Sequence, residues 1–76
     1  MTDDHAVRKT VRGVWAAVLG ADVDDSADFY ELGGHSFAAV QIITRLNEKL
    51  PVRTSVTVLL DNPRFGDFVS ALAMEA

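Results

Sequence analysis

The chain has 76 residues, a formal net charge of −4 and no cysteine. A chain this short forms one small domain with a thin core, so we treat residues 1–76 as a single domain. Without cysteine, disulfides, zinc–thiolate sites and thiol catalysis are excluded, and the acidic balance argues against a nucleic-acid partner. There is no signal peptide after Met1 and no apolar run long enough to cross a membrane. We therefore expect a cytoplasmic protein.

The first predicted helix covers about residues 4–19. Apolar residues recur at helical spacing over 7–19, and Gly20 follows where a C-terminal glycine is expected. Asp4 suits the positive end of the helix dipole and can pair with Arg8 four residues later. Three basic side chains fall off the apolar stripe and are interpreted as a solvated face: Arg8, Lys9 and Arg12.

A long connection, residues 20–35, follows the first helix. Loops of this length are uncommon in small domains and are usually functional or disordered. Because Val23, Phe29 and Leu32 offer apolar anchors, we expect an ordered loop that packs on the helices. Asp28 is placed to cap a short turn that runs through Leu32.

The second predicted helix runs from Ser36 to Leu50 and ends before Pro51. Its apolar stripe is expected to contain Ala39, Val40, Ile43, Leu46 and Leu50. Phe37 and Ile42 fall away from that stripe. Large exposed apolar side chains indicate a surface for a partner, so both residues are predicted to contact one.

Two shorter helices complete the prediction. The β-branched run at 55–58 has no second strand to pair with, so we expect a short helix over 56–61 with Ser55 as its cap. Asn62-Pro63 resembles an N-cap with proline at the first helical position, which predicts a last helix over 64–74 that Gly66 weakens. The predicted fold is all-α, a small four-helix bundle with one long crossover loop.

The stretch Leu32-Gly33-Gly34-His35-Ser36-Phe37 places a hydroxyl at the start of the best amphipathic helix. Gly33 and Gly34 remove side chains beside Ser36 and tolerate unusual backbone angles. Ser36 is also a good N-cap residue, and a phosphate on it would meet free backbone N–H groups. A Gly-Gly turn with a serine cap would be the simpler explanation of these residues taken alone.

Residues 28–37, Asp-Phe-Tyr-Glu-Leu-Gly-Gly-His-Ser-Phe, resemble the attachment region of peptidyl carrier proteins, the thiolation domains of nonribosomal peptide synthesis. Residues 15–20 are similar to the end of that family's first helix. Gly-Gly-His-Ser favours a peptidyl carrier over an acyl carrier of fatty acid synthesis, which more often has Asp-Ser-Leu. Phe37 stands where leucine is usual, and Arg64 where threonine is usual.

The resemblance implies an acyl-carrier-protein-like fold and a non-catalytic carrier. It implies that Ser36 carries a 4'-phosphopantetheine arm, with Gly33, Gly34 and His35 as flanking motif residues. The implied partners are a phosphopantetheinyl transferase, an adenylation enzyme, and condensation, tailoring or thioesterase enzymes. Phe37, Ile42 and Val58 are the expected partner surface. We expect a free-standing monomer.

The residues also allow alternatives to a peptidyl carrier. An acyl carrier of polyketide or fatty acid type is the nearest. Residues 34–38 approximate a Gly-x-Ser-x-Gly nucleophile elbow, but Ala38 replaces the last glycine and no histidine follows Ser36, so a hydrolase is disfavoured. A calcium loop from Asp22 lacks the required glycine and glutamate. A helical interaction module without modification stays open.

Overall fold

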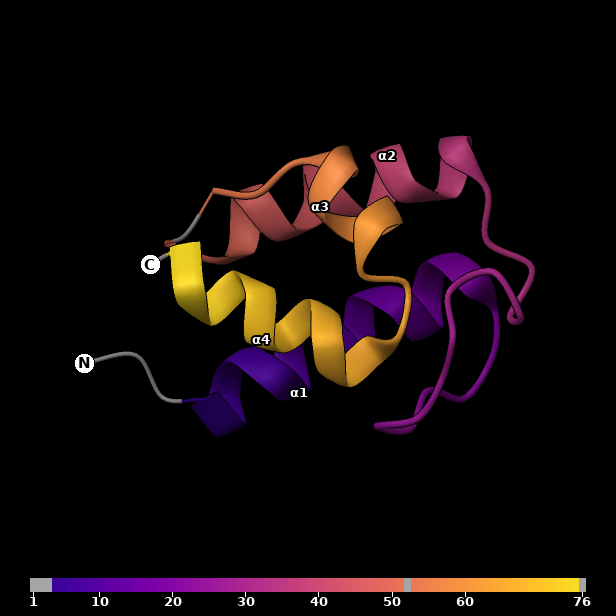
Figure 1. Cartoon of the computed structure of the whole chain (residues 1–76), viewed down its shortest axis with the longest axis horizontal. Helices are drawn as coiled ribbons and strands as arrows, with labels where there is room; N and C mark the ends of the chain where they lie inside the picture. Colours follow the sequence, from indigo (N-terminus) through magenta and orange to yellow (C-terminus); the bar gives the residue numbers. More distant parts are fainter. Residues whose placement is uncertain (1–3, 52, 76) are drawn as a thin grey trace.

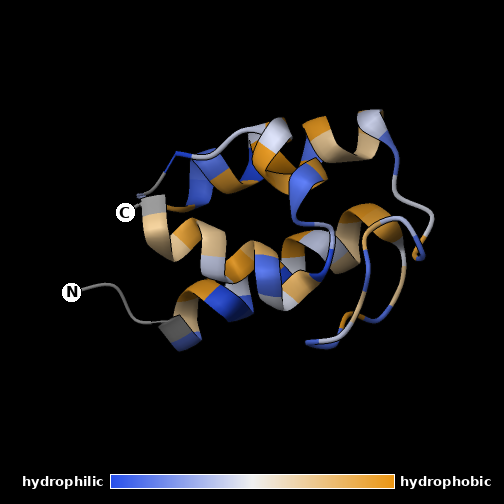
Figure 2. Ribbon diagram, in the orientation of Figure 1, coloured by the Kyte–Doolittle hydropathy of each residue, from blue (hydrophilic) through white to orange (hydrophobic). Residues whose placement is uncertain are grey.

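The computed structural model describes residues 4–51 and 53–75, which contain four helices: α1 (Asp4–Leu19), α2 (Ser36–Lys49), α3 (Val56–Asp61) and α4 (Phe65–Glu75). The predicted all-α bundle is confirmed. α1 lies between α4 and α2, and α3 lies beside α2 and contacts α4 (Figure 1). Apolar residues of α1 and α2 turn toward the interior between these helices (Figure 2).

The core is built around Trp15, the single tryptophan of the chain. Its ring centroid lies 5.9 Å from that of Phe29, 5.3 Å from Phe65 and 5.8 Å from Phe68. All four side chains are fully buried. Burial of a side chain of this size stabilises the fold by about 1.5–3 kcal/mol. The core therefore ties the loop, which contributes Phe29, to α1 and α4.

The bounds of α1 agree with the prediction, and α3 is a helix with Ser55 as its N-cap, as expected. The Ser55 hydroxyl accepts a hydrogen bond from the Val58 N–H at 3.4 Å. α2 ends at Lys49, one residue earlier than expected, because Leu50 precedes proline and is extended (φ −110°, ψ 150°).

The last helix, predicted over 64–74, lies one residue later, but its predicted cap and first residue, Asn62 and Pro63, were wrong. Asn62 is the C-cap of α3: its side-chain amide donates to the Val58 carbonyl at 2.9 Å. Pro63 lies outside α4, and its carbonyl accepts the Phe29 N–H at 2.7 Å. The Phe65 N–H in turn donates to the Ala27 carbonyl at 2.8 Å. This exchange joins the long loop to the α3–α4 connection.

The side-chain amide of Asn47 holds the connection between α2 and α3. Its oxygen accepts the Thr54 N–H at 2.9 Å, and its nitrogen donates to the Thr54 carbonyl at 3.2 Å. The Asn47 amide thereby satisfies both the N–H and the carbonyl of Thr54, a residue that lies outside the helices. The connection is thereby directed back along α2, which brings α3 against it.

Candidate functional site

Ser36 is the first residue of α2 and is exposed. The expected role of Ser36 as N-cap was wrong, because the cap is His35, which has extended backbone angles (φ −150°, ψ −178°). The His35 side chain makes no capping hydrogen bond. The first N–H groups of a helix have no intrahelical acceptor, so this end of α2 can receive an anion close to the Ser36 hydroxyl.

The two glycines before His35 are required by different constraints. Gly33 has φ +89°, a left-handed conformation that side chains rarely adopt. Gly34 lies against Phe29: a Cβ there would be 2.6 Å from two ring carbons and from the carbonyl oxygen of Phe29. The Gly34 N–H donates to that carbonyl at 2.8 Å. The backbone before Ser36 is thus packed directly on the buried Phe29.

Asp28 caps the turn that precedes the glycines, as the sequence indicated. Its carboxylate accepts the backbone N–H groups of Tyr30 at 2.9 Å and Glu31 at 3.2 Å. The Leu32 N–H donates to the Asp28 carbonyl at 3.0 Å. The expectation of an ordered loop is confirmed, because Val23 and Phe29 are buried and Leu32 packs against the core.

Asp25 anchors the middle of the loop to two helices. Its carboxylate accepts from Arg8 at 3.2 Å and from Arg12 in a closer contact. Its backbone carbonyl accepts the Gly66 N–H at 3.2 Å, and a Cβ on Gly66 would lie 3.3 Å from that oxygen. Arg12 also lies over the Phe65 ring, 5.1 Å from its centroid. Arg8 and Arg12 therefore hold the loop and do not form a free solvated face.

The sequence carried a signal for this anchor, since a basic helix face precedes an acidic loop, but it did not identify which carboxylate pairs. Asp24, the neighbouring residue, faces Ser26 instead. Its carboxylate accepts the Ser26 hydroxyl at 2.8 Å and the Ser26 N–H at 2.9 Å. These hydrogen bonds hold the pKa of the Asp24 carboxyl below its ordinary value of 3.8, and the one from the Ser26 hydroxyl has the largest effect.

An exposed apolar surface lies beside Ser36, although its membership differs from the prediction. Phe37 is 64% exposed, as expected. Ile42 is fully buried, so its assignment to the partner surface was wrong, and Val40, expected in the core, is 51% exposed. Val58 is half-buried and packs against the core.

Tyr30 is a further exposed aromatic residue that the sequence interpretation missed. It is 51% exposed, and its hydroxyl donates to the Leu60 carbonyl of α3 at 3.4 Å. Its ring meets that of Phe29 edge to face at 5.5 Å. Tyr30 thus bridges the loop and α3. We name Tyr30, Phe37 and Val40 the apolar surface.

His35 and Ser36 are adjacent and both exposed. Among residues 4–51 and 53–75, no group of three His, Cys, Asp or Glu side chains is arranged to hold a metal ion. Within the same residues, no helix combines the length and apolar character that crossing a membrane requires.

Residues 9–72 match the protein family described as a phosphopantetheine attachment site. The chain belongs to this family. Its members carry a covalently attached 4'-phosphopantetheine group, so this chain is a phosphopantetheine carrier domain. The match includes the whole loop, α2 and α3, and therefore Ser36, the two glycines before it and the apolar surface.

Relatives of the carrier domain occur in large synthetases. The domain is 36% identical over 70 residues, 91% of its length, to the phosphinothricin tripeptide synthetase PhsC of Streptomyces viridochromogenes, and covers 6% of that protein. It is 54% identical over 54 residues to the isonitrile lipopeptide synthase of Mycobacterium tuberculosis, covering 62% of the chain and 2% of the synthase. The chain thus spans only a small part of these relatives.

Solved structures agree on the fold. BlmI, a type-II acyl-carrier-protein from Streptomyces verticillus involved in bleomycin biosynthesis, superposes with a TM-score of 0.85 at 29% identity, covering 93% of this chain and 87% of that one. A nonribosomal peptidyl carrier domain superposes with a TM-score of 0.76 at 25% identity, covering 92% and 88%. The acyl-carrier-protein-like fold expected from the sequence is confirmed.

The surroundings of Ser36 fit an attached phosphopantetheine. The residue is exposed, so a second protein can reach it. Gly33 and Gly34 place no side chain beside it, and the N-terminus of α2, uncapped by the His35 side chain, is open to a phosphodiester.

Proposed function

We propose that this chain is a peptidyl carrier domain and that Ser36 is the residue that bears its 4'-phosphopantetheine group. The observation that supports this most directly is the position of Ser36 as the exposed first residue of α2. The structural similarity to a peptidyl carrier domain and the sequence similarity to peptide synthetases support an aminoacyl or peptidyl group as the cargo.

In this proposal the Ser36 oxygen forms a phosphodiester with the phosphopantetheine half of coenzyme A. The pyrophosphate bond breaks, the adenosine bisphosphate half leaves, and the hydroxyl proton passes to a base of the transferase. The N-terminal amides of α2 then stabilise the phosphodiester charge by about 0.3–1 kcal/mol at this exposed position. The bound group supplies a terminal thiol that holds an acid as a thioester, which a chain without cysteine cannot do itself.

We infer that the domain does not catalyse a reaction. His35 precedes Ser36 directly and its backbone is extended, and adjacent side chains of an extended backbone point to different sides. This geometry does not favour proton transfer from Ser36 to His35, and the loop before Ser36 is not the strand that a nucleophile elbow needs.

The apolar surface beside Ser36 is the proposed docking surface. Its members lie on the loop and the first two turns of α2, and the Tyr30 hydroxyl joins it to α3 near Val58. Exposed aromatic residues are enriched among those that dominate interface energies. The proposed partners are a phosphopantetheinyl transferase, an adenylation enzyme, and condensation, tailoring or thioesterase enzymes.

The experiment is the intact mass of the chain after incubation with coenzyme A, magnesium and a broad-specificity phosphopantetheinyl transferase, beside Ser36→Ala. We expect the wild-type chain to gain one phosphopantetheine and the variant to gain none. A folded wild-type chain that gains no mass would contradict the proposal and favour an interaction module without modification.

The nearest second candidate is an acyl carrier of polyketide or fatty acid type, which the high TM-score to a type-II acyl-carrier-protein keeps open. Both candidates require the modified serine, so loading separates them. Modified chain is offered to an aminoacyl-adenylating enzyme and to a malonyl transferase. Aminoacyl loading alone supports the peptidyl carrier, whereas malonyl loading alone supports the acyl carrier.

A further inference from the structure

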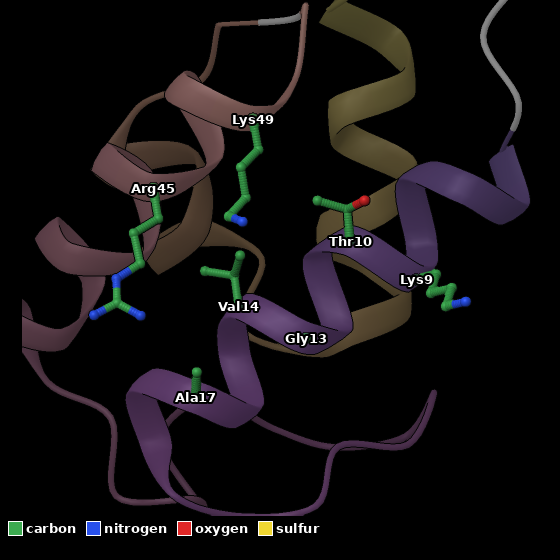
Figure 3. Close-up of a pocket in the computed structure, with 7 residues that line it drawn as sticks. All are labelled: Lys9, Thr10, Gly13, Val14, Ala17, Arg45 and Lys49. Carbon is green, nitrogen blue, oxygen red and sulfur yellow. The ribbon is translucent and has the colours of Figure 1, made fainter.

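A cleft of about 370 Å³ opens between α1 and α2, and no residue of the apolar surface lines it. Its lining residues are Lys9, Thr10, Gly13, Val14, Ala17, Arg45 and Lys49. Figure 3 shows the Lys49 side chain extending from α2 toward Val14 of α1, with the charged groups of Arg45 and Lys9 toward opposite sides of the view. The lining of the cleft thus combines a small apolar floor with three cationic side chains.

Gly13 contributes no side chain to this cleft. It is an exposed residue in the interior of α1, and a Cβ placed on it would meet nothing within 4 Å. Its φ is not in the positive range, so neither backbone geometry nor packing requires a glycine here. Glycine in a helix interior costs about 1 kcal/mol relative to alanine. With glycine at this position, α1 places no side chain in the cleft beside Val14.

The charge of the cleft is opposite to that of the chain. Three of the seven Lys and Arg residues line it and no Asp or Glu does, while the net charge is −4. Within the described part of the chain, no carboxylate forms an ion pair with Lys9, Arg45 or Lys49, whereas Arg8 and Arg12 are both paired with Asp25. These three exposed cations are therefore available to an external anion.

We propose that this cleft docks an acidic segment of a partner protein that places one aliphatic side chain on the Gly13–Val14 floor. Lys9 and Ala17 are eight residues apart, about 12 Å along α1, which fits a short segment. Arg45 lies nine residues after Ser36, about 14 Å along α2, so the segment leaves Ser36 accessible. Three cations are too few for the extended contact that a nucleic-acid backbone makes. The inference is independent of Ser36 modification.

The probe is a fluorescein-labelled peptide of four Glu-Glu-Leu repeats, titrated into the ¹⁵N-labelled chain at low salt. The net charge of the chain repels this peptide, so binding reports the local cations. We expect saturable binding, amide shifts confined to the α1–α2 cleft, and weaker binding at high salt. A peptide of Gln-Gln-Leu repeats should bind at least tenfold more weakly.

Two matched charge variants test the location. Arg45→Gln/Lys49→Gln and Arg53→Gln/Arg64→Gln each remove two exposed cations and take the net charge from −4 to −6. The first is expected to weaken peptide binding by about fivefold to tenfold, as for two surface ion pairs. The second should leave it within about twofold. Equal losses in both variants would overturn the proposal.

Gly13→Gln tests the floor. The new side chain enters open space and raises helix propensity, so the variant should unfold at higher temperature and yet bind the peptide at least fivefold more weakly. Unchanged peptide affinity in this more stable variant would overturn the proposal. So would the absence of any binding to the wild-type chain, or equal binding of a twelve-nucleotide oligothymidylate.

Discussion

At the scale of single residues, Gly34 connects the core to the proposed modification site. Its lack of a side chain lets the backbone before Ser36 lie directly on the ring and carbonyl of Phe29. The sequence motif indicated that small residues are needed beside the serine. It did not indicate that the constraint on Gly34 comes from a buried aromatic side chain, because that contact forms only when the loop folds onto the helices.

We expect Gly34→Ala to destabilise the fold by about 1–3 kcal/mol, since the added Cβ would lie 2.6 Å from atoms of the fully buried Phe29. Urea unfolding followed by circular dichroism measures the change. Gly13→Ala is the control and should stabilise the chain by about 1 kcal/mol. Equal stability of the two variants would contradict the packing argument.

Phe37 and Ile42 test the difference between the apolar surface and the core. Phe37→Ala should change the free energy of unfolding by about 0.5 kcal/mol or less and slow modification by the transferase about tenfold. Ile42→Ala removes a fully buried side chain and should cost about 2–5 kcal/mol. A loss of stability in Phe37→Ala as large as that in Ile42→Ala would contradict the assignment.

The hydrogen bonds between Asp24 and Ser26 predict how the stability of the fold changes with pH. The pKa of Asp24 in the folded state lies below its ordinary value, which is about 3.8 in the unfolded chain. The stability that the ionised Asp24 carboxylate contributes is therefore fully present above that unfolded pKa and is lost as the pH falls through the folded pKa. Ser26→Ala removes the hydroxyl donor and should raise the pKa of Asp24 toward 3.8. The carboxyl carbon shift of Asp24 against pH measures it. An unchanged midpoint would contradict the assigned cause.

At the scale of elements, α2 explains the main error of the sequence interpretation. Successive helical residues are about 100° apart, so measured from Ala39, Ile42 lies about 60° round the helix and Val40 about 100°. α2 packs against both α1 and α3, and the buried arc therefore includes Ile42 and excludes Val40. A stripe judged from spacing alone did not account for two neighbouring helices.

The helices themselves were largely predictable, because caps and apolar period act locally. The N-cap of the last helix was not, since Asn62-Pro63 has the local pattern of a helix start while Asn62 caps the end of α3 and the Pro63 carbonyl accepts a hydrogen bond from the loop. The ion pairs that anchor the loop could not be predicted from the sequence either. Pairing of Asp25 with Arg8 and Arg12 depends on contacts 17 and 13 residues apart.

The loop anchor can be tested with Asp25→Asn. It removes the carboxylate charge shared by two half-buried arginines, so we expect a loss of about 0.5–1 kcal/mol that shrinks in 1 M salt. Thermal unfolding at both salt concentrations measures it. Asp22→Asn is the control, because the described residues include no partner for Asp22 and its loss should be near zero. Equal losses of stability in Asp25→Asn and Asp22→Asn would contradict the role of Asp25 in holding the loop.

At the scale of the whole molecule, the core holds the loop, and the loop in turn positions the start of α2. Trp15 and Phe29 join α1 to the loop, and Gly34 carries that contact to the backbone just before Ser36. The motif in the sequence indicates Ser36 as the modified residue, which stays a prediction. The structure adds the physical connection between that serine and the centre of the fold.

The most direct measurement of the central claim is the fragment spectrum of the modified chain, which locates the phosphopantetheine among the four serines. Ser26, Ser55 and Ser70 are also exposed, so exposure alone does not select a site. We expect the adduct on Ser36 only, and modification of Ser26→Ala at the wild-type level. An adduct on any other serine would contradict the account.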